Sequence, residues 1–111
     1  MAIIQNRRLG SAVTRDIANA NYQITDFATP NTAQETVTNV SITQIYWTGD
    51  WTIKRGATVV FQTANNTGFW DLNSHGISLT DNNAANLTIN TTSTSATLIL
   101  KLSKTSSALT F

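Results

Sequence analysis

The clearest structural pattern in this chain lies near its end, in the stretch Ala96-Thr97-Leu98-Ile99-Leu100-Lys101-Leu102-Ser103. Its three leucines occupy every second position. Because successive side chains of a β-strand point to opposite faces, this alternation predicts a half-buried strand with the leucines turned inward. Ile99 shares the outer face with Lys101, so we expect that face to be partly apolar.

From Val37 onward the chain repeats this kind of run, rich in Val, Ile, Thr and aromatic residues and interrupted by Gly, Asn or Asp. The interrupting residues tolerate the positive φ angles of tight turns. The predicted strands are residues 37–47, 51–54, 58–63, 69–72, 77–80, 86–91 and 96–103. Seven such strands predict an all-β protein, an antiparallel β-sandwich that is jelly-roll-like.

The composition sets limits on partners and chemistry. Thr, Asn and Ser supply 41 of the 111 residues, and charged residues only 12%. A net charge of +1 gives no long-range field for gathering nucleic acid or an anionic membrane, so neither is an expected partner. The absence of cysteine from the sequence excludes a disulfide framework and thiolate metal sites.

The first third of the chain shows neither the two-residue alternation of a β-strand nor the 3.6-residue spacing of an amphipathic helix. We therefore predict an extended N-terminal arm over residues 1–34, a β-sandwich body over 35–111, and a boundary near Pro30. The spacing of Leu9, Val13 and Ile17 leaves a short helix as an alternative. A body independent of the arm is expected to fold without residues 1–30.

The arm carries the candidate anchors for a partner. Arginine makes paired hydrogen bonds to carboxylates, so docking on an acidic protein surface is one interpretation, and solvated charges are the other. The candidate partner-binding residues are Ile3, Ile4, Arg7, Arg8, Leu9 and Arg15.

The beginning of the sequence carries no targeting signal that we recognise. Only Ile3 and Ile4 precede the first arginines, whereas a signal-peptide core needs roughly 7 to 15 apolar residues. No stretch of the sequence is long and apolar enough to span a bilayer. Synthesis in the cytoplasm is the resulting expectation.

Catalytic equipment is sparse in this sequence. His75 is the single histidine and lies in a predicted turn, so we interpret it as structural rather than as part of a triad with Ser74 and Asp71 or Asp81. Asp50 and Asp71 could pair only if the fold placed them about 5 to 9.5 Å apart. We predict no enzyme activity, no metal site and no cofactor.

Tryptophans offer the alternative function. Segments 48–53 and 67–72 share the pattern Thr-Gly-x-Trp-x-aliphatic, which predicts two strands that each start after a glycine turn or bulge. Trp51 and Trp70 are expected in the core, and Trp47 is left open. If exposed, the three indoles could stack on sugars, which would make the chain a carbohydrate- or receptor-binding β-sandwich module of a fibre or tail.

The arm at residues 1–8, the strand at 41–47, the Thr/Asn-rich surface and the ending at 98–102 together resemble a family type. It is that of the small all-β virion proteins of tailed bacteriophages, particularly capsid decoration (cement) proteins. The resemblance implies a location on the capsid surface, contacts to the major capsid protein and to neighbouring copies in a homo-oligomer, stabilisation of the shell, and no catalysis. It assigns no individual site residue.

Overall fold

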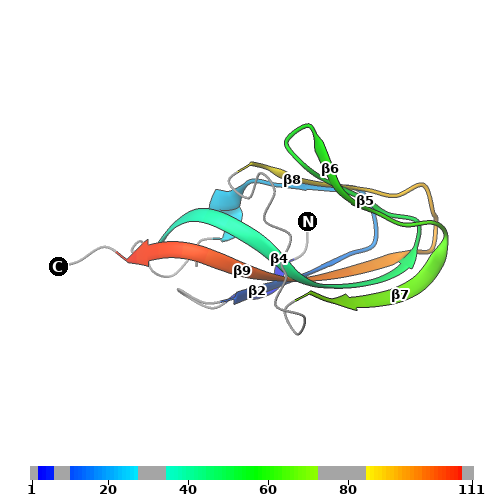
Figure 1. Cartoon of the computed structure of the whole chain (residues 1–111), viewed down its shortest axis with the longest axis horizontal. Coiled ribbons are helices and arrows are strands. Elements are labelled where there is room, and N and C mark those ends of the chain that lie inside the picture. Colours follow the sequence, from blue (N-terminus) through cyan, green and yellow to red (C-terminus); the bar gives the residue numbers. More distant parts are fainter. Residues whose placement is uncertain (1–2, 7–10, 28–34, 73–84, 109–111) are drawn as a thin grey trace.

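Two antiparallel β-sheets face each other in the computed structural model, which describes residues 3–6, 11–27, 35–72 and 85–108. Figure 1 shows them as a lower and an upper layer. The five-stranded sheet has the order β1 (Ile3–Asn6), β2 (Ser11–Asp16), β9 (Thr97–Ala108), β4 (Glu35–Gly49), β7 (Asn66–Asp71). The four-stranded sheet has the order β3 (Ala20–Tyr22), β8 (Leu87–Asn90), β5 (Thr52–Arg55), β6 (Thr58–Gln62), and a 3₁₀ helix, η1 (Ile24–Phe27), follows β3.

The strand order is that of a jelly roll. Strands pair from the outside of the sequence inward, β2 with β9, β3 with β8, β4 with β7 and β5 with β6, all antiparallel. The pairs β4–β9 and β5–β8 then join these strand pairs into the two sheets. A long hairpin rolled in this way gives the eight-stranded double sheet of a jelly roll. The predicted antiparallel, jelly-roll-like β-sandwich is therefore confirmed.

The core is organised by β9, which pairs with β2 on one side and with β4 on the other. Leu98, Leu100 and Leu102 are all 0% exposed, as their alternation predicted. The residues packed with them from the remaining elements include Tyr22, Phe27, Ile42, Ile45, Trp51, Ile53, Leu87 and Ile89. Full burial of each large apolar side chain stabilises the fold by about 1.5 to 3 kcal/mol.

The predicted division into an arm (1–34) and a body (35–111) is wrong for residues 3–6 and 11–27. Strand β2 pairs with β9 over its whole length, and β3 pairs with β8. The inward side chains of β2 are Ala12, Thr14 and Asp16, all buried. They fit the narrow space beside the leucines, but two of the three are polar, so the strand shows no apolar alternation. The alternative of a short helix is also wrong here.

Polar contacts join these first elements to the rest. The Tyr22 hydroxyl donates to both carboxylate oxygens of Asp16 at 2.7 and 2.9 Å, which links β3 to β2 across the two sheets, while burial raises the pKa of Asp16. The Lys104 ammonium donates to Asn6 Oδ1 at 2.7 Å and to the Phe27 carbonyl at 3.0 Å. One lysine of β9 thus binds both β1 and η1.

A second buried cation connects the sheets near β5. The Arg55 guanidinium donates to the Val40 carbonyl at 2.6 Å and to the Ala85 carbonyl at 3.1 Å. Burial lowers the pKa of Arg55. Because hydrogen bonds to backbone carbonyls compensate the desolvated charge, this arginine can lie inside the sandwich.

Most predicted strands are found with small changes of boundary. Those at 37–47, 51–54, 58–63, 86–91 and 96–103 correspond to β4, β5, β6, β8 and β9. Strand β7 begins at Asn66, before the predicted 69, because Gly68 lies within the strand rather than in a turn. The predicted strand 77–80 and the boundary at Pro30 lie outside the described residues.

Deleting residues 1–16 is expected to abolish cooperative folding. The deletion removes the β2 ladder, whose hydrogen bonds contribute about 1 kcal/mol each, against a total stability of about 5 to 15 kcal/mol for a typical domain. It also uncovers one side of β9. Thermal unfolding followed by circular dichroism checks this.

The matched control deletes residues 1–6, which removes the edge strand β1 and the hydrogen bonds of Asn6 with Lys104 and with the Phe27 carbonyl. This shorter deletion should lower the melting temperature and keep a single transition. A fully cooperative transition after loss of residues 1–16 would restore the interpretation of an independent arm.

Candidate functional site: a polar hollow and an aromatic row

A polar hollow lies at one end of the sandwich, where the β4–β5 turn meets the β8–β9 connection. Gly49 closes the turn with a φ of +90°, and a Cβ on it would lie 2.6 Å from Ala96 Cβ. Glycine is therefore required here both by conformation and by space. The turn places Asp50 directly against residues 91–93.

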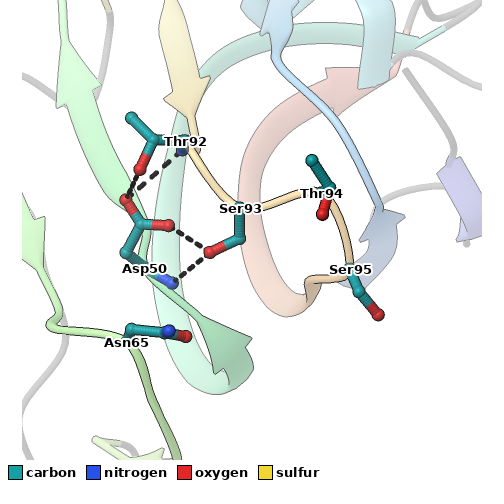
Figure 2. A pocket seen from close by; sticks show the side chains of 6 residues that line it. All are labelled: Asp50, Asn65, Thr92, Ser93, Thr94 and Ser95. Atoms are coloured by element: carbon teal, nitrogen blue, oxygen red, sulfur yellow. Dashed lines mark hydrogen bonds between the residues drawn. The ribbon is translucent and has the colours of Figure 1, made fainter.

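The Asp50 carboxylate is held by hydroxyl groups of that connection (Figure 2). Thr92 Oγ1 donates to one oxygen at 2.6 Å, and Ser93 Oγ donates to the other. Thr91 Oγ1 donates to the Asp50 carbonyl at 2.6 Å, and the Asp50 amide donates back to Ser93 Oγ at 3.3 Å. These contacts fasten two chain segments that are more than forty residues apart.

The hydrogen bonds from Ser93 and then Thr92 hold the pKa of Asp50 well below its usual value. The hollow is lined by Asp50, Asn65, Thr92, Ser93, Thr94 and Ser95. None of these six is a histidine, a basic residue or an aromatic residue. The one carboxylate is already engaged by hydroxyl groups of the β8–β9 connection, so the arrangement functions as a clamp between two loops.

The catalytic candidates do not assemble among the described residues. In that part of the chain no group of three or more His, Cys, Asp or Glu could hold a metal. Gly49 pairs with Asn66 at one end of β7 and Gln44 with Asp71 at the other, so Asp50 and Asp71 lie about 17 Å apart along the sheet. That excludes a carboxylate pair. Ser74, His75 and Asp81 lie outside the described residues.

The three tryptophans do not form one platform. Trp51 is 1% exposed, and its indole N–H donates to the Thr48 carbonyl at 2.8 Å, so the prediction of a core position is confirmed. It precedes β5 after the Gly49 turn, as the shared sequence pattern predicted. The corresponding prediction for Trp70 is wrong, because this residue lies within an edge strand and is 42% exposed.

Trp47 is half-buried, and its indole packs over Gly68 in the neighbouring strand. A Cβ on Gly68 would lie 2.2 Å from the Trp47 ring. The same indole donates to Asn66 Oδ1 at 2.8 Å and contacts the Phe61 ring at 5.2 Å between centroids. The ring is thus engaged by its own protein, which leaves Trp70 as the one substantially exposed indole among the three.

The outer face of the five-stranded sheet carries a row of outward-facing side chains, of which the sequence indicated only Ile99. Cross-strand register places Arg15 beside Ile99, Ile99 beside Tyr46, and Tyr46 beside Phe69. We call these four residues the outer row. Tyr46 is 39% exposed and Phe69 is 60% exposed. Neighbouring residues in such a row lie about 4.5 to 5.5 Å apart, so their side chains form one continuous strip.

The rows next to the outer row are largely polar. On one side Val13 is followed by Lys101, Gln44 and Asp71, and on the other lie Thr97, Thr48 and Thr67. The strip is therefore an apolar centre with a polar rim, which is the anatomy of a protein interface. Its signal in the sequence is the departure of Ile99 and Tyr46 from an otherwise polar outer face.

The candidate partner-binding residues separate in the structure. Ile3 is partly buried against the core of its own sandwich, and its role as an anchor for a partner stays a prediction. Ile4 is exposed, and Arg15 is exposed in the outer row. Arg7, Arg8 and Leu9 lie outside the described residues. No helix in the described ranges has the length and apolar character needed to cross a membrane.

Comparison with known proteins identifies no family. No family model matches the chain, and no curated protein matches it. Among solved structures, the cupin domain of Cnp3 from Schizosaccharomyces pombe is similar, with 13% sequence identity and a TM-score of 0.46. The alignment covers 94% of this chain and 59% of that one. At this level the similarity carries no functional argument, and the jelly-roll assignment depends on this chain's own strand order.

The clamp predicts a pH dependence of stability. Because the pKa of Asp50 is lower in the folded chain than the ordinary 3.8, its carboxylate stabilises the fold above that value, and the stabilisation is lost as pH falls through the folded pKa. We expect Asp50→Asn to lower the melting temperature near neutral pH. The difference from the unmodified chain should shrink on acidification below 3.8.

Ser93→Ala is the matched variant, since it removes the largest cause of the lowered pKa. Carboxyl ¹³C chemical shifts should show Asp50 titrating closer to 3.8 in that variant than in the unmodified chain. Identical titration in both chains would contradict the clamp.

Proposed function

We propose that this protein is a non-catalytic structural protein of a virus particle, of the kind that decorates and stabilises a capsid. It attaches to the shell through the outer row of the five-stranded sheet. The observation that carries the proposal is the row of Ile99, Tyr46 and Phe69 across that face, in a chain whose described hollow beside Asp50 has its one carboxylate already hydrogen-bonded.

The strip has the features of a docking surface. Aromatic side chains supply large contact area at low conformational cost, and Tyr46 and Phe69 are adjacent on a rigid sheet. The strands beneath them are central or next to central in the sheet, apart from β7. A rigid platform loses little entropy on binding, which favours affinity.

The positive charges near the outer row indicate the kind of protein surface that binds there. Arg15 lies at one end of the outer row, and Lys101 lies exposed in the adjacent row on the same strand as Ile99. Guanidinium and ammonium groups beside an apolar strip fit a protein surface that presents carboxylates around an apolar patch. This matches the expectation of contact with a major capsid protein, which the sequence resemblance implies.

The structure gives less support to the sugar-binding alternative. Trp51 is buried and Trp47 is engaged by Gly68, Phe61 and Asn66. Trp70 leans on Phe61, with 5.7 Å between ring centroids. A single tilted indole at a sheet edge is a weak platform for a pyranose, so the outer row is the better-supported surface.

The test uses virus particles whose genome encodes this chain, purified after deletion of its gene. The unmodified chain should sediment with these particles and saturate at a fixed ratio to the shell protein. Combined substitution Tyr46→Ser and Phe69→Ser should weaken binding by about 2 kcal/mol or more, roughly thirtyfold. Both side chains are exposed, so the melting temperature should change little.

The control is Val59→Ser, which removes an exposed apolar side chain, 48% accessible, from the opposite sheet. Its binding should equal that of the unmodified chain. Absence of the protein from complete particles, or equal binding of the Tyr46/Phe69 variant, would refute the proposal.

A further inference from the structure

Within the described residues, strand β7 is an edge of the five-stranded sheet that lacks the usual protection. Among the described strands it has a neighbour, β4, on one side. Natural proteins blunt exposed edges with lysine, proline, bulges or very short strands. Strand β7 is six residues long, contains none of these residues and pairs with β4 without a register shift.

The other described edges differ from β7. Strand β3 has three residues, and the pairings of β1 and β6 each contain a register shift. Strand β7 also carries the two most exposed aromatic side chains of the described residues, Phe69 and Trp70. Apolar side chains on an unprotected edge are expected to be covered by another strand in the working assembly.

The sequence of β7 is complementary to itself in one antiparallel register. When Phe69 of one copy lies opposite Phe69 of a second copy, the side chains that face outward in one copy also face outward in the other. Gly68 then lies opposite Trp70, which brings the Trp70 indole of one copy next to the Trp47 indole that packs over Gly68 in the other. On the outer face Thr67 lies opposite Asp71, where a hydroxyl can donate to a carboxylate.

We propose that a second copy of this chain pairs along β7 in this register, around a two-fold axis at Phe69. The two five-stranded sheets then form one continuous sheet of two copies. This inference goes beyond the proposed function and is tested without any shell. Its consequence is structural: the outer row of one copy continues through Phe69 into the outer row of the other.

The continuous row has a functional implication. Two docking strips held in line on one rigid sheet bind a repeating surface with a high effective concentration for the second contact. The isologous arrangement also closes on itself, so it adds one copy and stops. The unprotected edge thereby forms a defined dimer interface instead of an aggregation site.

The first experiment measures self-association of the full-length chain by sedimentation across a dilution series. The mass should rise from 12.1 kDa toward twice that value with concentration. Thr67→Glu places like charges opposite Asp71 at two positions of the dimer and should weaken association about tenfold. Thr67→Lys places opposite charges there and should associate at least as well as the unmodified chain.

Thr105→Glu is the matched control, because it adds the same charge to an exposed position on the central strand β9. Its association should be unchanged. A mass of 12.1 kDa at every concentration would overturn the dimer and leave the edge to an extended segment of another protein. Equal weakening by Glu at positions 67 and 105 would also overturn it.

The second experiment reads the register directly, since the sequence contains no cysteine. Phe69→Cys puts two thiols on the axis, where facing Cα atoms lie about 4.5 to 5.5 Å apart, within disulfide range. Oxidation should link the two copies. Thr67→Cys places its thiols about 13 Å apart and should not link. Linking at position 67 and not at 69 would contradict the proposed register.

Discussion

The structure depends on the register of β9, the central strand of the five-stranded sheet. Because side chains alternate with a period of two, one register decides both faces at once. Burying Leu98, Leu100 and Leu102 forces Ile99 and Lys101 outward. The core and the proposed docking surface are therefore not independent features, and a slip of one residue would exchange them.

The same constraint explains how distant residues form one surface. Arg15, Tyr46 and Phe69 come from β2, β4 and β7, which are far apart in the sequence. They lie in one row because β2 pairs with β9, β9 with β4, and β4 with β7. At the end of the sandwich, Asp50 fastens the β4–β5 turn to the loop that leads into β9. This clamp keeps the beginning of the central strand in place.

The sequence was sufficient for the fold class and insufficient for its first elements. Leucine alternation identified β9, whereas β2 buries Ala12, Thr14 and Asp16, whose composition carries no apolar period. Gly68 indicated a turn, but it lies within β7. Glycine is needed at this position because the Trp47 indole occupies the space that a side chain would fill. The outer row could not be predicted, because register between strands is a tertiary property.

Radical footprinting of the chain, alone and bound to particles, tests the central claim most directly, since it reports the exposure of individual side chains. Tyr46 and Phe69 should lose reactivity on the particle, while Val59 on the opposite sheet keeps it. Protection of Val59 with unchanged reactivity of Tyr46 and Phe69 would contradict docking through the five-stranded sheet.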